Sequence, residues 1–409
     1  MKTVLNEIKP SREESMVLKR AADHFTNKLN RELKNARAII GGSVAKNTFL
    51  KGDHDIDIFV QFDKEKYKSK DLSKILHSKL KAVFKKTSKI SGLHKIHGSR
   101  DYFQIRQDPF TFEIIPILKI AKAEEAKNIT DISPLHTEWV SGWIKQHNHL
   151  ADEIRLAKAF CKANKLYGAE SYIRGFSGYT LEILTIAHNS FENLMKAASR
   201  WKSGIRVDVQ NHGVKKLNKS KVSPLIAIDP VQSDRNTAAA LSGKKFNEFV
   251  ELAKKFLHNP SPEFFRQTKF DLEGIKSASI LRVIPLKGKE DIVGAKLIKC
   301  MEYIHKKLKE EGYEVTEHDW YWDDKEAYFW YFVKEKNLPL EKKHYGPPVK
   351  EKKHLDEFMK IYSHYPIKKD GLRVYVELKR RHTNINHFLE DLIEKEGYIR
   401  EKVRNIDVL

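Results

Sequence analysis

The sequence predicts an α+β fold divided among several domains, and three observations support this. Short apolar runs separated by turn residues in the region 36–118 indicate strands with one helix between them. Apolar residues recur mainly at helical spacing through residues 146–260. After residue 265 the pattern returns to strands that flank a long amphipathic helix. A chain of 409 residues is long enough for several domains with cores of their own.

The first domain is expected over residues 1–145. Its first long helix should begin after Ser11, because Glu14 follows three residues later in the capping-box pattern. The other predicted elements are strands at 36–40 and 55–62, a helix at 72–84, and a hairpin of strands 102–106 and 110–118.

Two further domains are expected, at residues 146–262 and 263–409. The second is mainly helical, and the third is a β-α-β-β module followed by a charged stretch at 334–353 and a tail. The predicted helices lie at 150–164, 180–197, 291–309, 354–362 and 386–396, and the predicted strands at 280–285, 313–316, 328–333 and 372–378.

The charge balance indicates a polyanionic partner. The chain has 76 Lys plus Arg against 55 Asp plus Glu, a formal net charge of +21. Such an excess favours nucleic acid as the partner over a small molecule alone. A charge-rich thermophilic composition would explain abundant charge but not the imbalance of sign.

Other compositional signals favour a cytoplasmic protein with no membrane association. No apolar run approaches the length of a membrane-spanning helix, and no long basic amphipathic helix stands out. Cys161 and Cys300 stand apart with no CxxC or Cys/His cluster, so neither structural zinc nor a disulfide is expected.

The stretch 39–60, IIGGSVAKNTFLKGDHDIDIFV, carries the strongest chemical signal. A Gly-Gly-Ser turn precedes Asp55 and Asp57, which stand in an apolar run. Residues two apart on a strand point to the same face, so these carboxylates should lie side by side. Like charges held together repel unless a cation lies between them. The pattern therefore indicates a divalent-metal site that handles a nucleoside triphosphate.

This stretch resembles the signature of the nucleotidyltransferase superfamily that includes DNA polymerase beta. Members carry a third carboxylate on a later strand, and Glu113 in FTFEIIPILK is the candidate here. The alternative interpretation of Glu113 is an exposed strand acid. The resemblance implies that the first domain is a nucleotidyltransferase palm with a mixed sheet.

Three further runs are similar to the archaeal, class I CCA-adding enzymes: YGAESYIRGFSGYTLEIL, DPVQSDRNTAAALS and HYGPPV. These tRNA nucleotidyltransferases build the 3′-terminal CCA. The resemblance implies template-independent addition of C, C and A from CTP and ATP to the tRNA 3′ end, with two Mg²⁺ ions and release of pyrophosphate. It also implies a catalytic head (1–145), a neck with the base pocket (146–262), and a body and tail (263–409) that hold the acceptor and TΨC region of tRNA. The oligomeric state stays open, a homodimer included.

The resemblance also assigns individual residues. It implies that Asp55, Asp57 and Glu113 are catalytic and bind the metal ions, although the family carries Asp at the position of Glu113. Asp53 is the alternative ligand. The residues implied to bind the nucleotide and its triphosphate are Gly42, Ser43, Lys46, His136, Lys158, Tyr167 and Arg235.

Arg235 is singled out by base chemistry as well. Cytosine and adenine share an amine donor beside a ring-nitrogen acceptor on the pairing edge, whereas uracil and guanine show the reverse. A guanidinium with a nearby acceptor can therefore accept C and A, and Asp229 is an acid near Arg235. A purely structural Asp–Arg pair is the alternative. Without the resemblance, His136, Lys158 and Tyr167 would be interpreted as a loop histidine, a solvated lysine and a core aromatic.

Two other functions are consistent with parts of this pattern. A poly(A) polymerase or oligoadenylate-type synthetase would share the glycine turn and the acids but add A only. A basic RNA-binding protein with a decayed catalytic domain is disfavoured by the intact turn and carboxylate pair. In the third region, the basic run 379–382 is a candidate phosphate contact or a solvated charge run.

Overall fold

The computed structural model describes residues 1–84, 91–213, 217–323 and 325–409. The chain divides into two compact units, Met1–Thr268 and Lys269–Leu409. The α+β fold is confirmed. The first unit contains one large apolar core around a sheet and another among helices. The expected boundary near residue 145 falls inside this unit and stays a prediction.

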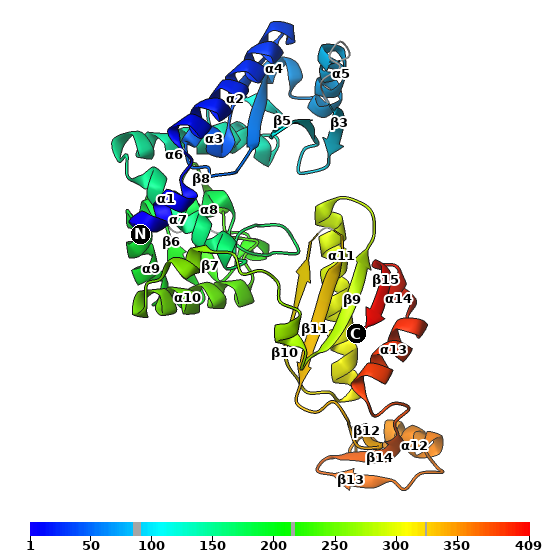
Figure 1. Ribbon diagram of the computed structural model, residues 1–409. Coiled ribbons are helices and arrows are strands. Elements are labelled where there is room, and N and C mark those ends of the chain that lie inside the picture. The colour runs from blue at the N-terminus through cyan, green and yellow to red at the C-terminus, as the bar shows by residue number, and fades with distance from the viewer. Residues whose placement is uncertain (85–90, 214–216, 324) are drawn as a thin grey trace. The chain divides into compact units, whose positions relative to one another are not determined.

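A five-stranded sheet carries the N-terminal part of the first unit (Figure 1). Its strand order is β1-β2-β5-β4-β3, in which β2 and β5 are parallel and the other neighbours are antiparallel. Helices α2 (Arg12–Glu32) and α5 (Leu72–Phe84) contribute apolar side chains to its core. The strands are β1 (Ala36–Ile40), β2 (Asp55–Asp63), β3 (Ser91–Ile96), β4 (Tyr102–Gln107) and β5 (Phe110–Lys119), with short helices α3 (Gly42–Lys46) and α4 (Lys64–Tyr67) between β1 and α5.

The predicted start of α2 is confirmed. The Ser11 hydroxyl accepts a hydrogen bond from the Glu14 N–H at 3.0 Å, and the Glu14 carboxylate accepts one from the Ser11 N–H at 3.3 Å. This capping box satisfies two of the backbone donors that a helix leaves free at its first turn.

The second half of the first unit is mainly helical, as expected. The predicted single helix at 180–197 is wrong, because Asn189 takes a left-handed conformation (φ 61°) and Ser190 caps a new helix. Helix α1 (Lys2–Ile8) packs here against α7, although the two helices lie far apart in the sequence. The elements are α6 (Ser133–Gln146), α7 (Leu150–Ala163), α8 (Gly178–His188), α9 (Phe191–Ala198) and α10 (Gly243–His258), with short strands β6 (Ile205–Val207), β7 (Leu225–Asp229) and β8 (Gln232–Asn236).

The second unit contains a four-stranded sheet of order β10-β11-β9-β15. The strand predicted at 313–316 is misplaced, since the buried Tyr313 precedes β10 and donates its hydroxyl to the Thr383 carbonyl. The C-terminal strand β15 was not predicted. The elements are β9 (Ser279–Pro285), α11 (Glu290–Glu311), β10 (Val315–Trp322), β11 (Ala327–Val333), α13 (Ile385–Lys395), α14 (Gly397–Arg400) and β15 (Val403–Val408).

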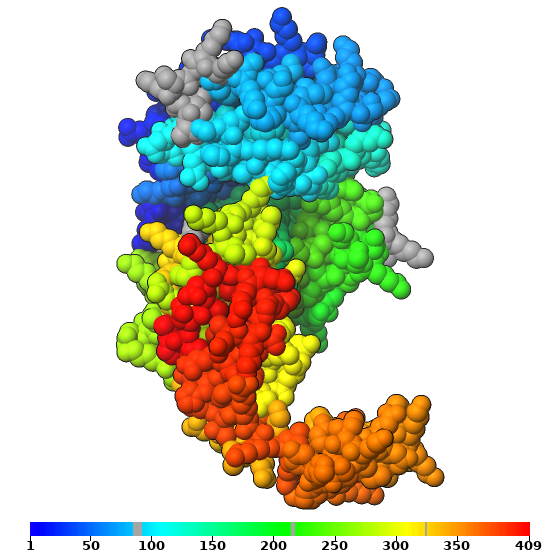
Figure 2. All heavy atoms as spheres, turned by 90° about the vertical axis from the view of Figure 1, so that its right-hand side faces the viewer, coloured from blue at the N-terminus to red at the C-terminus, as the bar shows by residue number. Residues whose placement is uncertain are grey.

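The second unit includes a smaller lobe, drawn in orange in Figure 2. This lobe has an apolar core of its own. Its sheet has the order β12-β14-β13, and α12 packs against it. Part of the charged stretch 334–353, for which no element was predicted, forms a strand here. The elements are β12 (Glu341–Pro348), α12 (Lys352–Ile361), β13 (Lys368–Asp370) and β14 (Arg373–Lys379). Within the described residues of both units, no helix is long and apolar enough to cross a membrane.

Candidate active site

The turn between β1 and β2 requires glycine at two successive positions. The Gly41 N–H donates to the Asp57 carbonyl at 2.8 Å, and a Cβ on Gly41 would lie 2.2 Å from the Phe59 ring. Gly42 has φ +57°, and a Cβ there would lie 1.6 Å from Asp57 Oδ2. The two glycines therefore let the turn pass directly against the Asp57 carboxylate.

The carboxylates lie where the strand pattern predicted them. Ile56 and Ile58 are completely buried in the sheet core, so Asp55 and Asp57 project from the opposite face of β2. Glu113 is the register partner of Asp57 on the parallel strand β5. The structure therefore brings the acids of β2 and β5 together beside the glycine turn.

Burial and mutual repulsion disfavour the charged forms of these acids. Burial raises the pKa of Asp57 to about 6, and the charge of Asp55 acts in the same direction. Burial, followed by the charges of Asp57 and Asp55, raises the pKa of Glu113 to about 7. The pKa of Asp55 is also raised, first by burial and then by Asp53. Oxygen donors whose negative charge lacks compensation fit a divalent cation.

Asp53 is engaged differently from the other acids. Its carboxylate lies before β2, 2.9 Å from Lys162 Nζ, and accepts the Leu50 N–H at 3.2 Å. Across the described ranges, no three His, Cys, Asp or Glu side chains are already gathered into a metal site. Asp55, Asp57 and Glu113 are therefore available as metal ligands but do not form a complete coordination site by themselves.

A pocket of about 370 Å³ opens beside this turn. It combines the glycine turn and the acids with side chains from α6 and α8, which belong to the helical half of the unit. Ser43, Lys158, Tyr167 and Arg235 are not among the described residues that line it. Its lining includes Gly42, Lys46, Asp57, Glu113, His136 and Tyr179.

One cluster of buried charge lies behind the turn, and we name it the Glu182 cluster (Lys46, Thr48, Lys158 and Glu182). Glu182 Oε2 lies 2.6 Å from Lys46 Nζ, and Oε1 lies 2.8 Å from Lys158 Nζ. Thr48 Oγ1 donates to Glu182 Oε1 at 3.0 Å and accepts from Lys158 at 2.9 Å. Burial alone would raise the pKa of Glu182, but Lys158 and Lys46 outweigh it and hold that pKa at about 2.

Helix α7 holds the loop that joins the turn to β2. Arg155 donates to two carbonyl oxygens of residues 47–49, at 2.6 and 3.0 Å. Lys158 and Lys162 continue the same row along α7 and bind Thr48 and Asp53. Further along, Tyr167 follows the helix, with Lys162 Nζ 5.2 Å from its ring centroid. The helical half of the unit therefore fixes the loop that precedes the catalytic strand.

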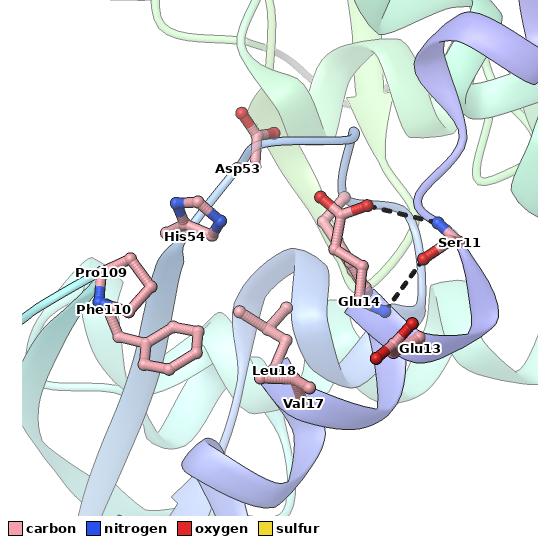
Figure 3. Close-up of a pocket in the computed structure, with 10 residues that line it drawn as sticks. Ser11, Glu13, Glu14, Val17, Leu18, Asp53, His54, Pro109 and Phe110 are labelled. Carbon is pink, nitrogen blue, oxygen red and sulfur yellow. Dashed lines mark hydrogen bonds between the residues drawn. The ribbon is translucent and has the colours of Figure 1, made fainter.

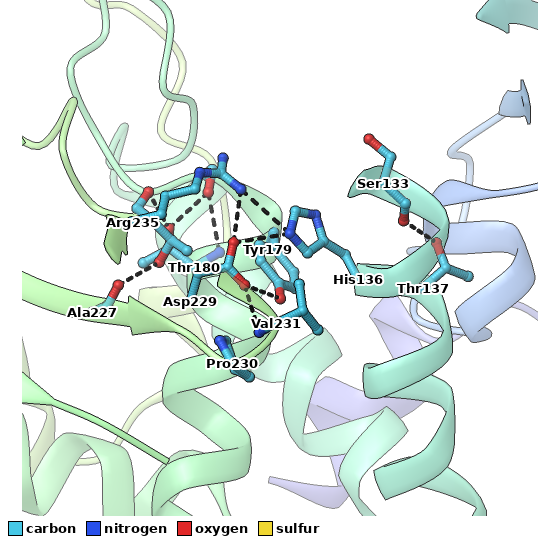
Figure 4. Close-up of polar contacts among 12 residues, drawn as sticks. Ser133, His136, Thr137, Tyr179, Thr180, Ala227, Asp229, Pro230, Val231 and Arg235 are labelled. Atoms are coloured by element: carbon cyan, nitrogen blue, oxygen red, sulfur yellow. Dashed lines mark hydrogen bonds and ion pairs between the residues drawn. The ribbon is translucent and has the colours of Figure 1, made fainter. Parts of the chain in front are cut away.

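A second cluster, the Asp229 cluster (His136, Tyr179, Asp229 and Arg235), joins α6, α8, β7 and β8 (Figure 4). Asp229 is completely buried, and its Oδ2 lies 2.9 Å from both His136 Nε2 and Arg235 NH1. The Tyr179 hydroxyl donates to Asp229 Oδ1 at 3.1 Å. The His136 and Tyr179 rings stack with centroids 4.1 Å apart.

The Asp229 cluster stays partly open. The Arg235 side chain keeps 30% of its surface exposed, so the guanidinium retains donors beyond its pair with Asp229. Burial lowers the pKa of His136, although Asp229 acts in the opposite direction. Burial alone would raise the pKa of Asp229, but His136 and Arg235 outweigh it and lower that pKa.

Three residues of these clusters, Thr48, Glu182 and Tyr179, were not singled out from the sequence. Glu182 is a single acid in the apolar run YTLEILTIA, and an acid at such a position requires a buried cation. Tyr179 stands at the start of the same helix, and no local signal distinguishes it from a core aromatic.

A second pocket, of about 310 Å³, lies beside the capping box of α2 (Figure 3). Two of its three carboxylates are already engaged, since Glu14 accepts from the N–H groups of Ser11 and Gly52, and Asp53 pairs with Lys162. Asp57 and Glu113 are not among the described residues that line it, so this pocket lacks the acids that line the first.

The basic run 379–382 of the second unit is partly engaged by acids of the same unit. Arg380 donates to the carbonyl and carboxylate oxygens of Glu311, at the end of α11. Arg381 and His382 both lie near Asp391 Oδ1, at 3.2 and 3.6 Å. These contacts tie the run to two helices of its own unit.

A glycine turn set against paired carboxylates on a mixed sheet defines a nucleotidyltransferase. A family model described as a nucleotidyltransferase domain matches residues 23–130. Two further models match downstream: the second domain of tRNA nucleotidyltransferase at 152–266, and the C-terminal domain of the CCA-adding enzyme at 285–405.

Curated relatives are similar over most of the chain. The CCA-adding enzyme of Nanoarchaeum equitans is 35% identical over 91% of this chain and 91% of its own length. The CCA-adding enzyme of Methanocaldococcus jannaschii is 31% identical over 96% of this chain and 90% of its own. The chain belongs to the CCA-adding enzymes, a family of tRNA nucleotidyltransferases, and the resemblance seen in the sequence is confirmed.

Solved structures show the same fold at low identity. A cytoplasmic RNA terminal U-transferase aligns with a TM-score of 0.52 and 14% identity, over 66% of this chain and 97% of its own. A Cid1 poly(U) polymerase structure with bound MgATP aligns with a TM-score of 0.52 and 13% identity, over 65% of this chain and 97% of its own. These likenesses extend the nucleotidyltransferase fold beyond the family.

Proposed function

We propose that this chain adds C, C and A in turn to the tRNA 3′ end, using CTP and ATP without a nucleic-acid template. The observation that carries this proposal is one pocket that joins the acids Asp57 and Glu113 to His136 and Tyr179. The similarity to enzymes named for CCA addition supports it over most of the chain's length.

The acids would hold the metal ions. Asp55, Asp57 and Glu113 supply the oxygen donors, and their raised pKa values fit a site completed by positive charge. Two bound Mg²⁺ ions would lower the pKa of the tRNA 3′-hydroxyl and neutralise charge on the triphosphate. The hydroxyl oxygen then bonds to the α-phosphorus as the bond to the leaving pyrophosphate breaks in line.

The glycine turn and the Glu182 cluster would hold the triphosphate. Gly42 lets the turn lie directly against the Asp57 carboxylate, so the backbone beside Ser43 would meet the triphosphate next to the acids, and Lys46 contributes an ammonium to the lining of the pocket. Lys158, on α7, adds positive charge from the far side of Glu182, and Tyr167 lies just beyond the C-terminal end of that helix. The protein's contribution to rate is placement and charge compensation.

Arg235 would select the base. Asp229 fixes one edge of its guanidinium at 2.9 Å, and the exposed remainder offers donors to the pairing edge of C or A. His136 and Tyr179 would link the base-selecting Arg235 to the triphosphate site, because both contact Asp229 and both line the pocket that contains Asp57.

The rest of the chain would hold tRNA. In this proposal residues 1–145 are the catalytic head, 146–262 the neck with the base pocket, and 263–409 the body and tail. The net charge of +21 suits an RNA partner.

Incubation of the protein with tRNA lacking CCA, labelled CTP, ATP and Mg²⁺ tests the proposal. Incorporation of CTP should stop after two residues and be followed by a single A. A poly(A) polymerase would extend with A alone, and that outcome would overturn the proposal.

A further inference from the structure

We propose that Glu182 is a positioning residue for nucleotide binding, which holds the Lys46 ammonium at the pocket wall while Lys158 and Thr48 fix Glu182 from behind. The inference rests on the proposed function and assigns a role within its triphosphate site. It concerns a residue that would touch neither the nucleotide nor a metal ion.

The carboxylate of Glu182 is held at both oxygens. It is completely buried in α8 between the buried residues Leu181 and Ile183. One oxygen meets Lys46, and the other meets Lys158 and Thr48, all within 3.0 Å. Because each oxygen has its own partner, the carboxylate cannot rotate without losing a charged hydrogen bond.

Lys46 is the member of the cluster that reaches the nucleotide side. It ends the short helix α3, which starts at Gly42, and it lines the same pocket as Gly42 and Asp57. A lysine side chain has many rotamers, so a fixed anion 2.6 Å from its Nζ selects one of them. The position of this ammonium therefore depends on an acid that lies 136 residues away in the sequence.

The charges of the cluster also favour an anionic ligand. Within the cluster, two ammonium groups against one carboxylate leave an excess of one positive charge, which also acts on the neighbouring Asp57 beside the glycine turn. A triphosphate arriving at the turn meets this excess in a region with little water to screen it. A solely structural ion triad would have the same contacts, so the test has to separate positioning from folding.

The test is a double-mutant cycle on nucleotide binding. Glu182→Gln, Lys46→Met and the double variant are compared with wild type for the KM and kcat of CTP and ATP on tRNA lacking CCA, and for the Kd of CTP alone. The double variant keeps the net charge of the wild-type cluster, since one cation and one anion are removed together. Glu192→Gln is the matched control, because Glu192 pairs with Lys196 at 2.6 Å on the exposed side of α9.

Glu182→Gln should raise the KM of both nucleotides about tenfold and change kcat by no more than about threefold. In the Lys46→Met background it should add nothing, because Glu182 acts through Lys46. The Glu192→Gln control should match wild type.

The positioning role is wrong if Glu182→Gln leaves KM unchanged, or if its effect and that of Lys46→Met multiply in the double variant. Should Glu182→Gln alone fail to fold, a double variant with a higher KM than Lys46→Met would equally overturn it. Absence of C and A addition by the wild-type protein would instead overturn the proposed function, and the CTP Kd series would still decide the role of Glu182.

Discussion

Glu182 and Asp229 are both completely buried carboxylates, yet they organise different kinds of partner. Glu182 binds two lysine ammoniums and a hydroxyl, all enclosed. Asp229 binds an imidazole, a phenol and a guanidinium, which are planar groups with fixed donor directions. An ammonium supplies charge that suits any triphosphate, whereas a fixed planar donor can distinguish one base edge from another. The difference suggests that the Glu182 cluster sets affinity and the Asp229 cluster sets selectivity.

The largest effect should come from breaking the glycine turn, because the Asp57 carboxylate lies directly against it. Gly42→Ala would place a methyl group 1.6 Å from Asp57 Oδ2 and force the carboxylate away, so incorporation of every nucleotide should be lost. Gly52→Ala is the matched control, since Gly52 also has positive φ (+79°) but has no atom within 4 Å of the new methyl group. It should keep most activity at a stability cost of about 1 kcal/mol. Equal loss in both variants would show that backbone strain, and not the Asp57 contact, is responsible.

A smaller effect should appear in acid stability and should follow the Glu182 cluster. The folded pKa of Glu182, about 2, lies below its ordinary value of 4.5, so the unfolded chain takes up this proton first as pH falls. The stability that the ionised Glu182 carboxylate adds to the fold is fully present above about pH 4.5 and is lost as pH falls toward 2. The thermal midpoint of wild type should therefore fall more steeply between these values than that of Glu182→Gln. Parallel slopes in thermal melts would contradict this assignment.

The smallest effect should come from Tyr179→Phe. This change removes one donor to Asp229 at 3.1 Å and leaves the ring stacked on His136. The remaining partners of Asp229 still orient Arg235, so the preference for CTP over UTP should fall by only about threefold, which is about 0.7 kcal/mol. The ratio of kcat/KM values measures it. A loss as large as that of Arg235→Ala would mean that Tyr179 itself contacts the base.

Much of the fold around the site could be predicted because its signals are local. The alternation of Asp55, Ile56, Asp57 and Ile58 predicted both the strand and its buried face, and the pair of Ser11 and Glu14 predicted the start of α2. Each of these patterns depends on neighbours within a few residues.

The parts of the fold and the site that could not be predicted depend on contacts between segments far apart in the sequence. Lys46 and Glu182 meet across 136 residues, and β15 pairs with β9 across more than a hundred. Neither partner carries a mark of the other in its local sequence. The break at Asn189 was missed for another reason, since apolar spacing continues through it and only the left-handed cap ends the helix.

The division between affinity and selectivity is tested most directly by the kcat/KM values for CTP and UTP in Arg235→Ala and in Glu182→Gln. Arg235→Ala should reduce the CTP/UTP ratio by about tenfold, because a wrong base no longer leaves a buried donor unpaired. Glu182→Gln should lower both values by the same factor and preserve the ratio. A preserved ratio in Arg235→Ala, or an altered ratio in Glu182→Gln, would contradict the assignment of base selection to the Asp229 cluster and of triphosphate binding to the Glu182 cluster.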